Sequence, residues 1–179
     1  MASYNEIPVS ALARLIGTPY CPTLLDVRID EDFDDDPRLI PGAYRHPFNS
    51  VVDLAETLKD RSVVVYCQKG LKISQGAAAL LRASGVNAEV LEGGQFAWRD
   101  AKLPLVITDK LPPLDALGRT VWVTRHRPKI DRIACPWLIR RFIDPKAQIL
   151  FVAASQVGNV AERFNATPFD IEDVFWSHR

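Results

Sequence analysis

The chain has 179 residues, in which 22 lysines and arginines balance 22 aspartates and glutamates. A hydrophobic share of 47% beside 25% charged residues is an ordinary globular composition, and the balanced charge gives no reason to expect a nucleic acid or a membrane as partner. No apolar run reaches the roughly 20 residues of a membrane helix, and the first residues do not resemble a signal peptide. Three cysteines imply no disulfide framework, so we expect a cytoplasmic protein.

In the first half of the chain, short apolar runs alternate with helical patterns. Nearly continuous apolar runs, typical of strands buried on both faces, occupy residues 23–27 and 62–66, with a weaker run at 88–91. Helical patterns occupy residues 10–16, 51–59 and 74–83. The alternation predicts an α/β domain with a mainly parallel sheet flanked by helices.

The chain changes character after Trp98. Residues 102–119 hold three of the thirteen prolines and little periodicity, which predicts a linker at 107–119 between a domain at 1–106 and a smaller region at 120–179. In that region the pattern predicts strands at 120–124 and 148–152 and helices within 131–143 and at 155–164. So short a region makes a small core, and we expect a small α/β appendage that docks on the first domain, on a partner or on a second copy of the chain.

The strongest chemical signal is Cys67, which stands between the predicted strand at 62–66 and a predicted helix. In a parallel sheet ligands bind beyond the carboxyl ends of the strands, and a cysteine before a helix N-terminus has its sulfur among unpaired backbone N–H groups. That position favours the thiolate of a group whose pKa is otherwise about 8.5. Gly70 allows the loop to aim its amides inward, while Lys69 and Lys72 add positive charge. From the loop alone, an inert buried cysteine remains an equal alternative.

Four motifs in the order and spacing of the rhodanese family resemble that family over residues 5–106. They are LLDVR (24–28), IPGA (40–43), VVYCQKG (64–70) and LEGGQFAW (91–98). The resemblance implies that Cys67 takes the sulfane sulfur of a small anionic donor such as thiosulfate, holds it as a persulfide and passes it to a thiol or cyanide-like acceptor, without a cofactor. It also implies that Asp26 and Arg28 belong to the scaffold below the loop. The backbone that would cradle the donor and the persulfide is that of Gln68, Lys69, Gly70, Leu71, Lys72 and Ile73.

The chain differs from many rhodanese-family members at two places, and its cysteine loop differs from that of related phosphatases. Lys72 falls where many members carry arginine, so the loop keeps the charge but loses the bidentate fork. Related phosphatases and arsenate reductases need an arginine six positions after the cysteine, where this chain has Ile73. Sulfur transfer is therefore favoured over oxyanion reduction. Arg38 and Leu39 stand where many members have Gly-His before the IPGA turn.

The second half resembles the front of the C-terminal domain of ChrB-type chromate-resistance proteins, through residues 121–144 and the later TPFDIEDVFWSHR. In that family the domain continues past the position of His178. The basic stretch that begins at Arg125 and Arg127 is interpreted in two ways: as an oxyanion patch suited to chromate or sulfate, or as exposed charges on a helix whose apolar side packs inward. That apolar side comprises Ile133, Trp137, Leu138 and Phe142.

The remaining features have simple interpretations. The acidic run DEDFDDD, residues 30–36, is expected to be a solvated loop. Cys135, His126 and His178 are metal-ligand types at a spacing that fits no zinc signature, so no metal is predicted. Cys21 is a candidate resolving thiol, but the sequence does not place it near the nucleophile.

Two functions follow as hypotheses. The first is a sulfurtransferase that works through a persulfide on Cys67. The second is a non-catalytic module that senses oxyanions or redox stress in a chromate-resistance system. An intact cysteine and a glycine-bearing loop favour the enzyme, since a degenerate module need not keep them.

Overall fold

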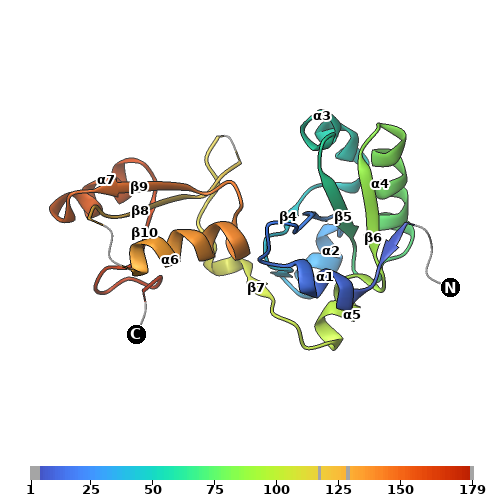
Figure 1. Cartoon of the computed structure of the whole chain (residues 1–179), viewed down its shortest axis with the longest axis horizontal. Coiled ribbons are helices and arrows are strands. Elements are labelled where there is room, and N and C mark those ends of the chain that lie inside the picture. Colours follow the sequence, from blue (N-terminus) through green and yellow to red (C-terminus); the bar gives the residue numbers. More distant parts are fainter. Residues whose placement is uncertain (1–4, 117, 128–129, 178–179) are drawn as a thin grey trace. The chain divides into compact units, whose positions relative to one another are not determined.

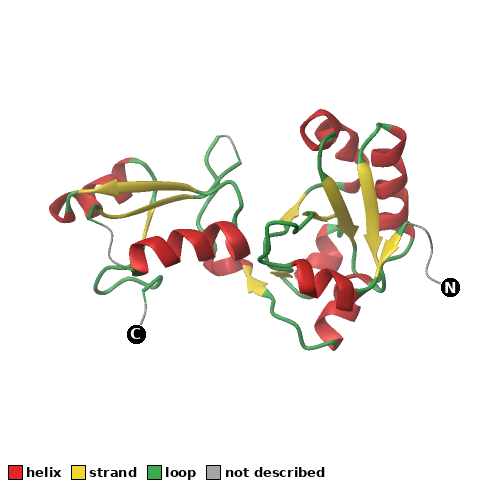
Figure 2. Ribbon diagram, viewed as in Figure 1, coloured by secondary structure: helices red, strands yellow, loops and turns green. Residues whose placement is uncertain are grey.

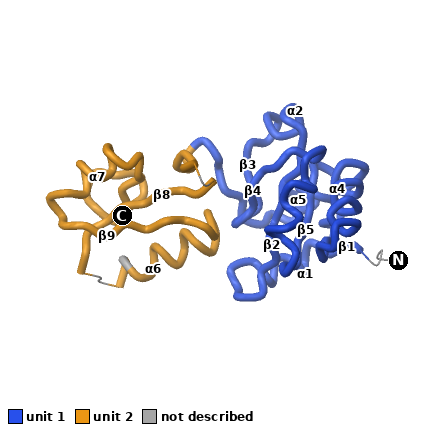
Figure 3. The backbone as a smooth tube through the Cα atoms, turned by 90° about the horizontal axis from the view of Figure 1, so that it is seen from above, with its two compact units in different colours: residues 1–109 blue, residues 110–179 orange. Residues whose placement is uncertain are grey.

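A computed structural model describes residues 5–116, 118–127 and 130–177. The chain forms two compact units, divided between residues 109 and 110, which Figure 3 colours separately. The division falls inside the segment predicted as a linker. Among the helices of the described ranges, none is long and apolar enough to cross a membrane.

Unit 1 is built on a parallel sheet of five strands in the order β1-β6-β5-β2-β4 (Figure 1). The strands are β1 (Glu6–Ile7), β2 (Thr23–Asp26), β4 (Tyr44–Arg45), β5 (Ser62–Tyr66) and β6 (Asn87–Leu91). The helices are α1 (Val9–Leu15), α2 (Asp30–Asp34), the 3-10 helix η1 (Phe48–Leu54), α3 (Ala55–Leu58), α4 (Lys72–Ala83) and α5 (Gly94–Asp100). This arrangement confirms the predicted α/β fold with a mainly parallel sheet.

Two elements differ from the expectation. The acidic run is not a loop, because Asp30–Asp34 form helix α2; three carboxylates in its first turn complement the partial positive charge of a helix N-terminus. The pattern at 51–59 predicted one helix, but the chain winds as the 3-10 helix η1 and then forms only the single turn α3. The loop prediction for the acidic run was therefore wrong, whereas the segment at 51–59 is helical as predicted and differs only in the type and extent of the helix.

The central strand β5 is buried on both faces, which explains its continuous apolar sequence. Val63, Val65 and Cys67 alternate along one face and pack in a core shared with α4 and η1. Val64 and Tyr66 on the other face are also fully buried, and Figure 2 shows helices on both sides of the strands. A strand held in this way places the residue that follows it in a well-defined position.

A buried ion pair ties the carboxyl end of β2 to the segment that follows it. Arg28 Nη2 lies 2.6 Å from Asp26 Oδ2, and both side chains are fully buried. Arg28 also donates from Nη1 to the main-chain oxygen of Asp36 and from Nη2 to that of Arg38, each at 2.8 Å. The guanidinium thereby joins β2, the end of the acidic run and the short strand β3 (Arg38–Leu39).

Unit 2 has a smaller parallel sheet of three strands in the order β10-β8-β9. Its elements are β8 (Val121–Arg125), α6 (Asp131–Leu138), the π-helical turn η3 (Ile139–Ile143), β9 (Gln148–Val152), the 3-10 turn η4 (Ala154–Gln156), α7 (Val157–Arg163) and β10 (Thr167–Pro168). Trp122 packs with Ile139 and Phe169 on one face of the sheet, and Val123 packs with Val157 on the other. Helices therefore cover both faces here too.

Two details of the second half correct the sequence interpretation. Ile133, Trp137 and Leu138 do not pack inward: they are 64%, 50% and 46% exposed, because the helix turns its Cys135 side towards the core instead. The first residues of the predicted linker are ordered. The strand β7 (Val106–Ile107) pairs antiparallel with β3, and a 3-10 turn η2 (Thr108–Lys110) follows it.

We expect Arg28→Met to lower the free energy of unfolding by about 3 kcal/mol, because it leaves the Asp26 carboxylate buried without its charge partner. Urea denaturation of the full chain, followed by circular dichroism, measures the change. Lys59→Met is the control, since Lys59 forms a solvent-exposed pair with Glu56 at 3.5 Å and such pairs contribute little. A loss for Arg28→Met no larger than the control's would contradict the stabilising role of the buried pair.

Candidate active site at the end of strand β5

Cys67 directly follows strand β5 and is separated from helix α4 by four residues. The loop turns back on itself at Gly70, whose φ of +70° is a backbone conformation that glycine adopts without strain. Only 4% of Cys67 is exposed. The thiol therefore sits at the carboxyl edge of a parallel sheet with little contact with water.

Hydrogen-bond donors surround the sulfur. The Oγ of Ser74 lies 3.3 Å from Cys67 Sγ. Burial by itself raises the pKa of Cys67, but hydrogen bonds from the Ser74 hydroxyl and from the backbone amides of Ser74, Lys69 and Leu71 outweigh it, and the net pKa is lowered. The loop thus stabilises a thiolate at a site that would otherwise disfavour charge.

The cysteine loop rests directly on a second loop, which joins β6 to α5. A Cβ on Gly70 would stand 2.7 Å from Leu91 O and 2.8 Å from Gly94 N, and a Cβ on Gly94 would stand 2.3 Å from Cys67 O. Real Cβ atoms do not approach other atoms so closely. Glycine at both positions is therefore required for the two backbones to touch.

The first amides of α5 hold the carbonyl groups of the cysteine loop. The Gln95 N–H donates to the oxygen of Cys67 and the Phe96 N–H donates to the oxygen of Gln68, each at 3.0 Å. Carbonyl oxygens are thereby turned away from the sulfur, while N–H groups of the same loop face it. This polarity suits a negatively charged sulfur atom.

The residues predicted to cradle a donor all lie in this loop or in the first turn of α4. Lys69, Leu71 and Lys72 are exposed, and Gln68 is half-buried. Gly70 is buried against the second loop, and Ile73 packs against the core. The amides of Lys69 and Leu71 reach the sulfur. Sequence reasoning missed Ser74, although a hydroxyl residue in the first turn of a helix after a cysteine loop is a signal that could have found it.

A cavity of about 320 Å³ lies at the same edge of the sheet. Asp26 of β2 pairs with Tyr66 of β5 on one side and with Arg45 of β4 on the other. Cys67 and His46, which follow Tyr66 and Arg45, therefore lie along the same edge of the sheet. They are separated by two strand spacings of about 5 Å each. Arg45 lines the cavity and forms an ion pair with Asp30 at 2.7 Å. The other lining residues are Arg28, Ile29, Glu31, His46, Pro47, Phe48 and Asn49.

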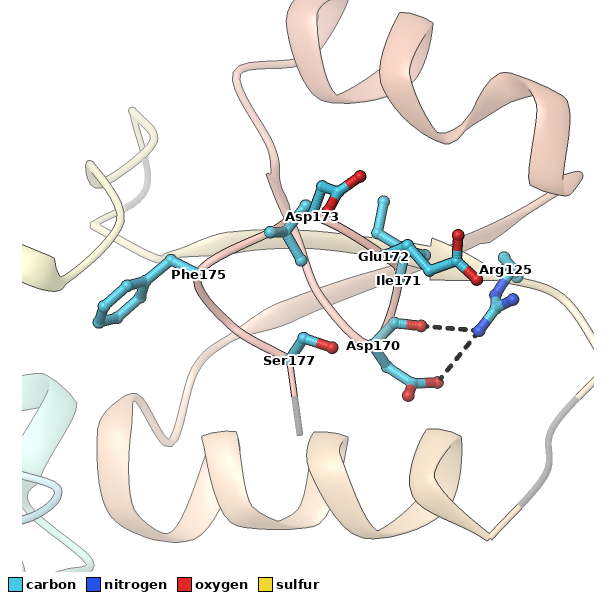
Figure 4. A pocket seen from close by; sticks show the side chains of 8 residues that line it. Arg125, Asp170, Ile171, Glu172, Asp173, Phe175 and Ser177 are labelled. Carbon is cyan, nitrogen blue, oxygen red and sulfur yellow. Dashed lines mark hydrogen bonds and ion pairs between the residues drawn. The ribbon is translucent and has the colours of Figure 1, made fainter. Parts of the chain in front are cut away.

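Unit 2 has a cavity of about 740 Å³, which contains Arg125 but not Arg127. Figure 4 shows the Arg125 guanidinium pointing at Asp170: its Nη2 donates to the main-chain oxygen at 2.9 Å and lies 3.9 Å from the carboxylate. Glu172 and Asp173 line the same cavity. Arg125 therefore faces an acidic loop, and the anion patch predicted for Arg125 and Arg127 stays a prediction.

Cys21, Cys67 and Cys135 all lie in the described part of the chain, and none of them forms a disulfide. Burial, followed by the charges of Asp170 and Asp131, raises the pKa of Cys135, the opposite of the effect at Cys67. Within the described ranges, no three His, Cys, Asp or Glu side chains come together as a group that could hold a metal ion. His178, one of the metal-ligand types noted above, lies outside the described residues.

Comparison with known proteins agrees with this geometry. Residues 9–101, just over half of the chain, match the family model of the rhodanese-like domain. The chain belongs to the rhodanese-like domain family. Residues 122–179 match a second family model, described as the C-terminal domain of ChrB. Both resemblances inferred from the motifs are thereby confirmed.

Individual relatives fall into the same two groups. A sulfurtransferase of Allochromatium vinosum is 30% identical over 103 residues, which cover 57% of this chain and 94% of that protein. Protein ChrB of Cupriavidus metallidurans is 29% identical over 109 residues, and the match spans 54% of this chain but only 33% of that protein. The solution structure of a rhodanese-like domain from an Anabaena protein aligns with a TM-score of 0.50 and 28% identity, covering 63% of this chain and 88% of that domain.

Ser74→Ala should raise the pKa of Cys67, because burial is then opposed by one donor fewer. We expect the rate of alkylation by iodoacetamide at neutral pH to fall about tenfold, since one hydrogen bond to a charged group contributes about 1.5 kcal/mol or one pKa unit. The midpoint of the pH profile of that rate should move to higher pH. Ser84→Ala is the matched control, since the Ser84 hydroxyl bonds to Leu80 O at the far end of α4. An unchanged midpoint would mean that the amides alone set the pKa.

Proposed function

We propose that the chain is a sulfurtransferase in which Cys67 carries sulfur as a persulfide. The observation that carries the proposal is the lowered pKa of a buried thiol whose surroundings are hydrogen-bond donors from one short loop and Ser74. A lowered pKa gives a larger thiolate fraction at neutral pH, and the thiolate is the nucleophile. The same donors are suited to the terminal sulfur of a persulfide, which is also an anion.

The reaction divides into two displacements at sulfur. In the first, the Cys67 thiolate attacks the outer sulfur of thiosulfate, a new S–S bond forms, the S–S bond of thiosulfate breaks, and sulfite leaves with the electron pair. In the second, an acceptor thiolate or cyanide attacks the outer sulfur of the persulfide, and Cys67 leaves as the thiolate. Each step transfers one neutral sulfur atom, so no cofactor or external reductant is required.

The surroundings of the thiol favour a small anionic donor. Cys67 is 4% exposed, which leaves a narrow approach to the sulfur. Lys69 in the loop and Lys72 in the first turn of α4 are both exposed, and their positive charges would attract an anion. Because neither lysine offers a bidentate fork, selection among anions would rest on size and on reactivity more than on shape.

Cys67→Ala should abolish persulfide formation while the protein stays folded. The measurement is intact mass after incubation with thiosulfate: the wild type gains one sulfur atom, the gain reverses with cyanide, and the variant gains nothing. Cys21→Ala and Cys135→Ala are the controls and should behave as wild type, since the Cys21 thiol donates to the main-chain oxygen of Pro22 and burial raises the pKa of Cys135. A gain that persists in Cys67→Ala, or folded wild-type protein that gains no sulfur, would sink the proposal.

The match of residues 122–179 to the ChrB C-terminal domain supports a second candidate, an oxyanion-binding module of a chromate-resistance system. Arg125 and Arg127 are the residues proposed to bind the anion. For this candidate we expect chromate or sulfate to bind in calorimetry, and Arg125→Gln to weaken binding about tenfold through loss of a charged donor. Arg163→Gln, at the end of α7, is the control. Absence of binding by the wild type, or binding that neither Arg125→Gln nor Arg127→Gln weakens, would overturn it.

A further inference from the structure

Gln95 connects the cysteine loop to the acidic run, because it donates one hydrogen bond to each of them. Its backbone N–H donates to Cys67 O at 3.0 Å, and its side-chain Nε2 donates to Asp36 Oδ2 at 2.7 Å. The side chain of Gln95 is completely buried. A single residue at the start of α5 therefore holds the carbonyl next to the sulfur and is itself held by a carboxylate 59 positions earlier in the sequence.

Asp36 is a firmly anchored partner. Its Oδ1 and Oδ2 accept hydrogen bonds from Arg38 Nε at 2.5 Å and Nη2 at 2.8 Å, and its main-chain oxygen accepts from Arg28 Nη1 at 2.8 Å. The hydrogen bond from Arg38 holds the pKa of the Asp36 carboxyl below its ordinary value, and the bond from Gln95 acts in the same direction. The carboxylate that receives the Gln95 amide is thus charged at neutral pH and fixed to β2 through Arg28.

Glutamine is a costly residue at this position if its task is only to fill the core. The Oε1 of Gln95 is buried and has no hydrogen-bond partner among the described residues. An unsatisfied buried acceptor destabilises a fold, and an apolar side chain of similar size would fill the same space without that loss. An apolar residue, however, could not make the hydrogen bond to Asp36.

We propose that Gln95 is a positioning residue for Cys67. Through its hydrogen bond to Asp36, Gln95 holds the first turn of α5 against the cysteine loop. The inference rests on the proposed function of Cys67. The side-chain bond fixes the first turn of α5, and that turn presents the Gln95 and Phe96 amides to the carbonyls of the loop. With those carbonyls held, Gly94 stays against Gly70, and the amides of Lys69 and Leu71 stay directed at the sulfur.

The test replaces Gln95 with leucine, which keeps the volume and removes the bond to Asp36. The readout is the pH profile of Cys67 alkylation by iodoacetamide, measured on the full chain together with its melting temperature. We expect the alkylation rate at neutral pH to fall about threefold and the midpoint of the profile to move to higher pH, because misaligned amides stabilise the thiolate less. A purely structural role would lower or raise the melting temperature and leave the midpoint in place, and that result would overturn the proposal.

A second set of variants tests whether Gln95 acts through Asp36. Asp36→Ala should move the midpoint as Gln95→Leu does, and the double variant should move it no further, since both changes remove one link. Asp36→Asn should keep most of the wild-type pH profile of alkylation, because the asparagine oxygen can still accept the hydrogen bond from Gln95 Nε2. Asp34→Ala, an exposed residue of the same acidic run, is the control and should change nothing. Additive shifts, or an Asp36→Asn profile like that of Asp36→Ala, would refute the link.

These measurements distinguish the inference from the proposed function. Alkylation reports the reactivity of the Cys67 thiol and requires no sulfur donor or acceptor. A protein that gains no sulfur from thiosulfate but shows the predicted shifts would lose the proposed activity and keep the positioning role of Gln95. A protein that forms the persulfide with an unshifted profile in Gln95→Leu would keep the activity and lose the positioning role.

Discussion

The environment of the Cys67 thiol depends on a close backbone contact between Gly70 and Gly94. Gly70 and Gly94 approach so closely that a methyl group on either would overlap main-chain atoms of the other loop. Both residues also have positive φ, so glycine is required at each position for two reasons: a side chain would not fit, and other residues rarely adopt that backbone conformation. Because the loops touch, α5 can hold the carbonyls of Cys67 and Gln68, and the amides that remain face the sulfur. The chemistry of the thiol is in this sense a consequence of backbone packing.

Two cysteines of the same chain show how much their surroundings matter. Burial raises the pKa of both Cys67 and Cys135. At Cys67 a hydroxyl and three amides reverse the effect, whereas at Cys135 the charges of Asp170 and Asp131 add to it. A thiolate is thus stabilised at the end of β5 and disfavoured on α6. Burial is shared by the two thiols, so the neighbouring dipoles and charges decide which of them can be a nucleophile.

The sequence predicted those parts of the structure that depend on local pattern. The continuous apolar run SVVVY predicted a strand buried on both faces, and the cysteine after it indicated the edge of the sheet where the candidate site lies. The two-residue strands β1 and β4 were not predictable, since two residues carry no periodicity and form only by pairing with longer strands. Ser74 and Gln95 were missed for a related reason: their roles arise from contacts across the fold, which no spacing along the chain reveals.

Both sheets are parallel and both place polar groups beyond the carboxyl ends of their strands, yet the two edges have opposite electrostatic character. At the end of β5 the donors are uncharged amides and a hydroxyl, and the nearby lysines add positive charge, so an anion is favoured. At the end of β8 the Arg125 guanidinium already faces Asp170, and Glu172 and Asp173 line the same cavity. An oxyanion that entered there would meet three carboxylates beside one paired cation. This difference in charge is the physical reason for placing sulfur transfer at Cys67 ahead of anion binding at Arg125.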